Sequence, residues 1–204
     1  MLERFLGRYQ VHEGRPGKVP LLGSPLSKIV SALGGCSFDA GLYRVFAAGE
    51  VASRTALAAE AFPDFAGRIQ CFGMDWLGRQ FATDSARGSE TDPEVLLLEP
   101  GTGEALEIPV ALSQFHDEEL VDYADSALAI DFYLVWLAGG GRAPAMDECV
   151  SYRTPLFLGG VDDTTNLEIC DVDVYWTLCA QALSQVRSRV WTTLEFWTVS
   201  PREK

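Results

Sequence analysis

The sequence predicts an α+β fold in which an antiparallel sheet packs with helices, either as a single compact unit or as two intimately packed subdomains. Three observations support this fold class. The 204 residues are 48% hydrophobic, which is enough to bury a substantial core. Short strand-type runs follow one another between residues 68 and 109. Helical patterns lie before and after this run and do not alternate with its strands.

The first third of the chain predicts short helices around a loop. Leu2–Tyr9 and Ser27–Leu33 have helical character, and the stretch Gly14–Pro25 between them is a loop because it holds three prolines and three glycines. Leu42–Phe46 predicts a strand. Glu50–Ala61, rich in Ala and Leu, predicts a helix that Pro63 stops.

Four antiparallel strands are expected next, at Arg68–Phe72, Trp76–Ala82, Val95–Glu99 and Ala105–Pro109. The last two form a hairpin because Pro100–Gly103 has the residues of a tight turn. Asp75 and Arg79 are expected to form a structural pair across a bend.

A long helix is predicted from a cap at Ser113 to about Ala138. Its apolar positions trace one face, and Gly139–Gly141 ends it. That face consists of Val121, Ala124, Leu128, Phe132 and Val135. Three acids in its first turn, Asp117, Glu118 and Glu119, suit the positive end of the helix dipole.

The C-terminal part joins an apolar run, a turn and an aromatic-rich helix. Pro155–Leu158 ends at Gly159-Gly160, and the polar residues 162–166 predict a turn. Leu167–Cys170 is expected to be extended, with Asp171 capping a helix. The apolar stripe of this helix is predicted to be Tyr175, Leu178, Cys179, Ala182 and Val186. Residues 190–199 fit a strand or a helix equally.

Six motifs occur in order along residues 38–185. They are GLYRVF from Gly41, FGMDWLGRQFA from Phe72, EPGTGE from Glu99, PLFLGG from Pro155, DDTTNLE from Asp162 and DVDVYWTLCAQ from Asp171. The last three resemble the C-terminal domain of bacterial immunity proteins that neutralise DNase effectors of type VI secretion systems, and the first three resemble the GAD-like region that precedes it. The resemblance implies a GAD-like region over residues 1–140 and an immunity-protein domain over residues 141–204, with the seam near 139–145.

Negative charge is concentrated in the middle of the chain. The formal net charge is −13, yet residues 1–30 hold five bases against two acids. Residues 88–108 and 114–132 each hold six acids and no base, and residues 147–173 hold seven acids and one base, Arg153. Direct binding of nucleic acid is therefore not expected, because phosphate neutralisation needs clustered Lys and Arg. The favoured partner carries positive charge.

Charge and resemblance together predict a non-enzymatic protein that binds a cognate toxin, a basic nuclease, and needs no cofactor. The expected partner-binding groups are Asp162, Asp163, Glu168, Asp171, Asp173, Glu118, Asp122 and Asp125. The sequence makes no prediction of the oligomeric state. Two alternatives stay open: a regulatory module of the same fold that binds another protein, and a metal-dependent hydrolase that uses the acidic turn.

Catalytic and metal-binding patterns are weak. The two histidines, His12 and His116, lack a nucleophile elbow, so Ser113 and His116 are expected to have capping or surface roles. The acids at 162–173 do not follow the EF-hand spacing. Five cysteines without CxxC spacing predict reduced and mostly buried thiols. Apolar runs too short to span a bilayer and the lack of a signal-type start predict a cytoplasmic protein without membrane contact.

Overall fold

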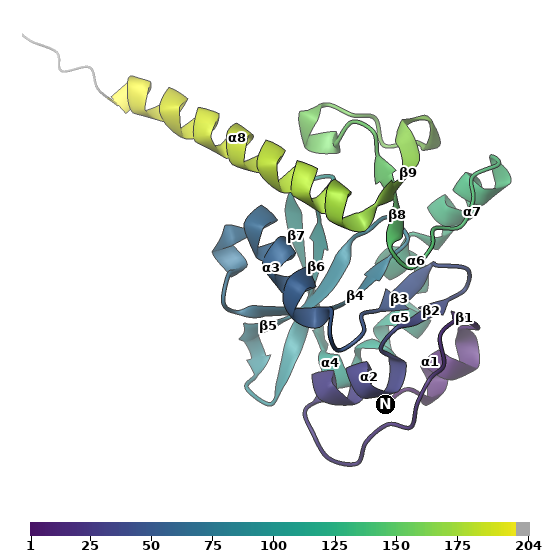
Figure 1. Ribbon diagram of the computed structural model, residues 1–204. Helices are drawn as coiled ribbons and strands as arrows, with labels where there is room; N and C mark the ends of the chain where they lie inside the picture. Colours follow the sequence, from purple (N-terminus) through teal and green to yellow (C-terminus); the bar gives the residue numbers. More distant parts are fainter. Residues whose placement is uncertain (199–204) are drawn as a thin grey trace, which may run out of the picture.

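Seven strands form one antiparallel meander in which the spatial order follows the chain order. The structure is a computed structural model that describes the backbone of residues 1–198 and the side chains of residues 1–188. Figure 1 shows the sheet crossed by helices on both sides. The strands are β1 (Val11–Glu13), β2 (Cys36–Phe38), β3 (Tyr43–Val45), β4 (Ile69–Asp75), β5 (Gln80–Ser89), β6 (Asp92–Glu99) and β7 (Glu104–Ala111). The predicted α+β class with an antiparallel sheet is confirmed.

The central strands are buried on both faces because successive side chains point to opposite sides of a strand. Along β6, Val95 and Leu97 join one buried cluster, whereas Leu96 and Leu98 join another. The register continues this division, since Leu97 pairs with Phe81 of the first cluster. The sheet therefore separates two hydrophobic cores.

The first core lies under the short helices of the chain. These are α1 (Glu3–Arg8), α2 (Pro25–Leu33), α4 (Leu112–Phe115), α5 (Glu119–Asp122), α6 (Ala124–Leu128) and α7 (Ile130–Ala138). Phe5, Ile29 and Phe115 supply fully buried side chains to it. The predicted helices at residues 2–9 and 27–33 are confirmed. Ser24 caps α2 by accepting a hydrogen bond from the Ser27 N–H, 3.2 Å away.

The second core is covered by α3 (Val51–Ala61), the short 3-10 helix η1 (Pro63–Phe65) and α8 (Val172–Thr198). In Figure 1, α8 crosses beside α3 and then extends past the sheet. Tyr175, Trp176 and Cys179 face this core, so the predicted stripe is correct at Tyr175 and Cys179. It is wrong at Leu178, which is 59% exposed, because Trp176 and Ala180 take the inward positions.

A second sheet consists of β8 (Glu148–Tyr152) and β9 (Leu167–Asp171), which pair with Cys149 opposite Cys170. Between them lie the 3-10 helices η2 (Leu156–Leu158) and η3 (Thr164–Asn166). Side chains of β8 enter both cores: Val150 belongs to the first core and Cys149 belongs to the second. Both cores thus contain residues from each side of position 140, and the division into two regions there stays a prediction.

The predicted long helix from Ser113 to Ala138 is wrong. Four short helices occupy this stretch, and Ala129 adopts a left-handed conformation with φ of 49° between α6 and α7. Ser113 lies inside α4, where its hydroxyl donates to Asp92 Oδ2 at 2.6 Å. The predicted stop at Gly139 is confirmed, since Gly139 caps the end of α7.

Strand boundaries also differ from expectation. The predicted strand at residues 76–82 begins only at Gln80, because residues 76–79 form the turn between β4 and β5. The hairpin around residues 100–103 is confirmed by the pairing of Glu99 with Glu104. The short strands β1 and β2 were missed, since three residues carry too little periodicity.

The cysteines behave as the sequence predicts. All five thiols are free, and four of them are buried, with Cys170 partly exposed. Trp76 and Trp176 are fully buried. Residues 190–198 continue α8 as a helix, while residue 199 lies outside the described residues. Within residues 1–198 no helix combines the length and apolar character needed to cross a lipid bilayer.

Candidate functional site

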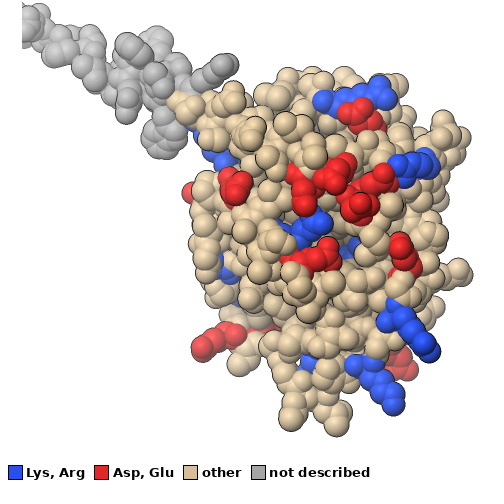
Figure 2. Space-filling view, in the orientation of Figure 1, with Lys and Arg blue, Asp and Glu red and all other residues tan. Residues whose placement is uncertain are grey.

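The candidate site is an acidic surface around the start of α8 and the β8–β9 sheet. Figure 2 shows carboxylates gathered on this face of the molecule, with a basic group among them. Asp171 ends β9, is exposed, and caps α8 by accepting a hydrogen bond from the Val174 N–H at 3.0 Å. The predicted cap is confirmed, and it positions this carboxylate at the positive end of a 27-residue helix.

Asp162 and Asp163 lie in the loop between η2 and η3, and both are exposed. Asp163 accepts hydrogen bonds from the backbone N–H and the hydroxyl of Thr165 at 2.8 and 2.5 Å. These bonds favour the charged carboxylate and lower the pKa of Asp163. Asp162 accepts a 2.6 Å hydrogen bond from the Tyr152 hydroxyl. The pKa of the Tyr152 phenol is raised well above its ordinary value, mainly because the side chain is buried and to a smaller extent because of this bond.

Three of the eight predicted site residues already pair with arginines of the chain itself. Arg54 forms an ion pair with Asp173, and Arg153 Nε lies 3.4 Å from Glu168 Oε2. Arg4 binds both oxygens of Asp122 at 2.9 and 2.6 Å, and this pairing lowers the pKa of Asp122. These three carboxylates have part of their charge compensated within the fold.

Glu118 and Asp125 form no ion pair with a base among the described residues. Glu118 accepts from the Gln114 amide at 3.0 Å, and Asp125 caps α7 by accepting from the Asp131 N–H at 2.8 Å. Because the long helix is broken, these two acids and Asp122 lie around α5 and α6 and do not follow one helix face. The structure therefore divides the predicted residues into two groups. Asp162, Asp163, Glu168, Asp171 and Asp173 form one, and Glu118, Asp122 and Asp125 form the other.

Of the three acids expected to serve the dipole of the long helix, Glu119 lies in the first turn of α5, whereas Asp117 has another role. Asp117 fastens the N-terminus, since its carboxylate accepts from the Phe5 N–H at 3.0 Å and lies 3.2 Å from the N-terminal amine. No set of three His, Cys, Asp or Glu side chains within residues 1–188 is arranged to hold a metal ion.

His116 is buried, which corrects the expectation of a capping or surface role. Its Nε2 lies 2.9 Å from the Tyr43 hydroxyl, and burial lowers its pKa to about 3. Ser113, three residues away, binds Asp92 instead. A neutral, enclosed histidine without a hydroxyl nucleophile on its other nitrogen cannot act as the base of a catalytic triad.

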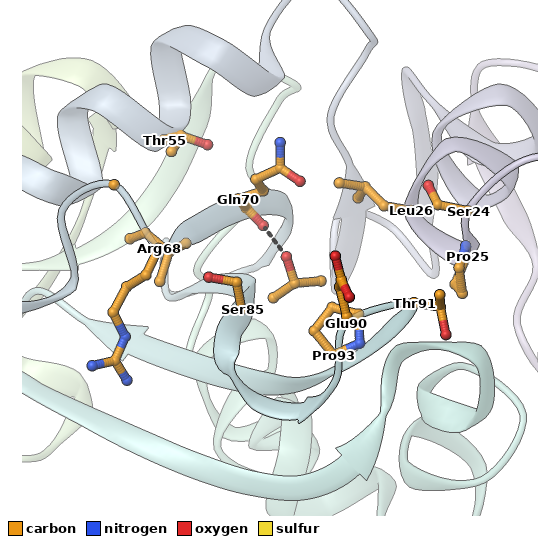
Figure 3. Close-up of a pocket in the computed structure, with 13 residues that line it drawn as sticks. Ser24, Pro25, Leu26, Thr55, Arg68, Gln70, Ser85, Glu90, Thr91 and Pro93 are labelled. Atoms are coloured by element: carbon orange, nitrogen blue, oxygen red, sulfur yellow. Dashed lines mark hydrogen bonds between the residues drawn. The ribbon is translucent and has the colours of Figure 1, made fainter.

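The structure also has a concave site that the sequence did not indicate. A pocket of about 360 Å³ lies between the start of α2 and strands β4 and β5 (Figure 3). Its lining is rich in hydroxyls, including Thr55, Thr83 and Ser85, and Thr83 bonds the carbonyl of Gln70. Arg68 and Glu90 are its only titratable lining residues, and Arg68 is paired with Asp84. Among the described residues, none of the lining hydroxyls forms a hydrogen bond with Glu90, the carboxylate of this lining.

Comparison with known proteins gives a family match over part of the chain and a solved structure of the same fold. Residues 112–182 match the family model described as "T6SS immunity protein Tdi1, C-terminal". This match confirms the resemblance to type VI secretion immunity proteins. A solved structure titled "Crystal structure of Atu4351 from Agrobacterium tumefaciens" shares the fold with a TM-score of 0.54 and 14% identity, over 89% of each chain. The comparison with curated proteins finds no match.

Proposed function

We propose that this chain, whose residues 112–182 carry the C-terminal domain of a type VI secretion immunity family, binds a DNase toxin and blocks its basic substrate-binding surface. The family match is the observation that carries the proposal. Proteins of an immunity family act by binding an effector. The acidic surface of this chain complements the basic surface of a protein that binds DNA.

The electrostatics support a basic partner. A nuclease presents Lys and Arg side chains to phosphates, and an inhibitor with carboxylates at matching positions competes for them. Five of the predicted groups keep a carboxylate without an arginine partner in residues 1–188: Asp162, Asp163, Asp171, Glu118 and Asp125. These five are the better candidates for toxin contact.

Asp122, Asp173 and Glu168 are the weaker members of the proposed set. Each would have to break its ion pair with an arginine of this chain before it could pair with a base of the toxin. Part of the favourable free energy of binding would therefore be lost. We assign them mainly to stabilising the fold.

The proposal is tested by co-expressing the chain with the product of the neighbouring toxin gene. Growth should be restored, the two proteins should co-purify, and the purified chain should inhibit DNA cleavage. Rescue by a chain carrying a stop codon before α8 would show that the assay does not report binding. Lack of both rescue and co-purification would contradict the proposed function.

A further inference from the structure

Helix α7 is apolar over most of its surface, yet one side of it faces solvent. Its sequence IDFYLVWLA has a single charged residue, Asp131. A helix of this kind is normally buried all round. Leu134 and Val135 are nevertheless 55% and 56% exposed. Asp131, Leu134, Val135 and Ala138 follow helical spacing, are all exposed, and form what we call the α7 ridge.

The other side of α7 is firmly held. The rings of Phe132 and Tyr133 pack on Trp76, with centroids 5.5 and 4.8 Å away. The Tyr133 hydroxyl donates to the Ala40 carbonyl at 2.6 Å, and the Trp136 indole donates to the Arg142 carbonyl at 2.9 Å. The ridge is thus presented on a helix that need not be ordered on binding, which lowers the entropic cost of association.

Negative charge borders the α7 ridge. Asp131 belongs to it, and Asp125 lies beside its N-terminal end, where it accepts from the Asp131 N–H. Residues 114–141 contain no Lys or Arg. The next base, Arg142, is bound by both carboxylate oxygens of Glu148 at 2.6 and 2.7 Å. An apolar surface with this border complements an apolar groove edged by basic side chains.

A second copy of the chain fits the α7 ridge less well. Each copy carries the same formal net charge of −13, so self-association over this surface would bring together two acidic molecules. A basic protein has the opposite charge.

We propose that the α7 ridge is the apolar centre of the toxin interface and docks, as a helix in a groove, into an apolar recess flanked by Lys or Arg of the toxin. This inference rests on the proposed function. Leu134 and Val135 supply short-range contact, while Asp125 and Asp131 orient the approach. The acids around the start of α8 lie on other elements, so the α7 ridge would make a contact that is separate from theirs.

The test compares two double variants that truncate exposed residues of the same types. Leu134→Ala with Val135→Ala truncates the α7 ridge. Val19→Ala with Leu106→Ala, the control variant, truncates a residue of the loop before α2 and one of β7 that are 37% and 43% exposed. Alanine keeps α7 intact. Binding to an inactive variant of the neighbouring-gene toxin is measured by titration calorimetry, and folding by circular dichroism.

We expect the α7 variant to bind about tenfold more weakly or worse, because buried apolar area is lost, and the control variant to bind within about twofold of the unchanged chain. Equal affinity of the α7 variant and the unchanged chain would overturn the inference while leaving the proposed function intact. Failure of the unchanged chain to bind would refute both.

Two further readouts complete the test. Asp131→Asn should slow association and reduce its salt dependence, and an unchanged salt dependence would contradict the role given to charge. Light scattering reports the oligomeric state. A dimer that the α7 double variant converts to a monomer would show that a second copy covers the ridge, which would also overturn the inference.

Discussion

The indole nitrogen of Trp176 donates a hydrogen bond to the carbonyl oxygen of Gly78, 2.8 Å away, across 98 residues of sequence. Gly78 belongs to the turn between β4 and β5, and Trp176 lies on α8. In the same turn, Trp76 points to the other core and donates to the Leu128 carbonyl at 2.9 Å. This turn therefore connects the sheet to helices on both of its faces, including the helix that Asp171 caps at the candidate site.

Gly78→Ala should destabilise the protein strongly. Gly78 has φ of 75°, and an added Cβ would lie 2.9 Å from Cys149 Sγ. We expect a loss of about 3 kcal/mol, from left-handed backbone strain plus steric overlap in the core. Gly140→Ala is the control, since Gly140 has φ of 92° and open space around it, and should cost only about 1–2 kcal/mol. Urea unfolding measures both, and equal losses would show that the contact with Cys149 relaxes.

Asp75→Asn should also be costly. Asp75 Oδ2 lies 2.6 Å from Arg79 Nε, and Asp75 is fully buried, which confirms the structural pair expected from the sequence. Asn retains an acceptor for the N–H groups of Leu77 and Arg79 but removes the charged carboxylate to which the buried guanidinium is bonded. The expected loss is about 3–5 kcal/mol in chemical denaturation.

The exposed pair of Arg153 and Glu168 provides the comparison. Glu168→Gln removes an ion pair in which both side chains are more than half exposed, and should cost less than about 1 kcal/mol. A loss at Asp75 as small as that at Glu168 would mean that the buried pair contributes no more than a surface pair.

Stability should depend on pH through Glu148. The Arg142 guanidinium and then the Ala145 N–H lower the pKa of Glu148 from 4.5 to about 2. A carboxyl whose pKa is lower in the folded state stabilises the fold above its unfolded pKa, and this contribution disappears as pH falls from about 4.5 towards 2. We expect Glu148→Gln to cost about 1 kcal/mol at pH 7, since the pair is partly screened by solvent, and progressively less below pH 4.5.

Thermal melts at several pH values measure this difference. Arg142→Gln should reproduce the same trend, because it removes the first cause of the shift. A gap between Glu148→Gln and the unchanged chain that stays constant from pH 7 to pH 3 would contradict the assignment.

Acids without arginine partners should contribute more to toxin association than acids with them. We compare Asp162→Asn, Asp163→Asn and Asp171→Asn with Asp122→Asn, Glu168→Gln and Asp173→Asn, two triple variants with equal change in formal charge. Asn still caps helices and accepts hydrogen bonds, so the first variant retains the fold. The second loses three ion pairs, and circular dichroism checks that it is folded. The first variant should associate about tenfold more slowly at low salt, and the second should be affected less.

Stopped-flow mixing with the inactive toxin measures these rates. Equal slowing by both variants would show that only net charge matters, and that the positions of Asp162, Asp163 and Asp171 are unimportant.

The sequence predicted elements well where local chemistry decides them. Pro63 after α3, the glycines after α7 and the turn residues at 100–103 act within a few residues, so these boundaries are correct. The single helix expected from Ser113 to Ala138 failed because its apolar spacing continues through Ala129, whereas packing of Trp76 against α7 and of Leu120 in the first core requires a change of direction there.

The candidate site shows the same limit. The turn position of Asp162 and Asp163 and the cap position of Asp171 were predicted correctly because turn and cap chemistry is local. The ion pairs of Asp122 and Asp173 were not visible in the sequence. Arg4 lies 118 residues from Asp122, and Arg54 lies 119 residues from Asp173. The α7 ridge was also missed, because an apolar run predicts burial and the sequence does not show which side of a helix lacks a neighbour.

By itself the sequence determined the fold class, the acidic character and the resemblance to an immunity family, because composition, turn residues and ordered motifs are properties of the linear chain. Tertiary structure decided which carboxylates keep their charge available and which apolar side chains stay exposed. Both depend on contacts between residues far apart in sequence, and such contacts arise only when the chain has folded.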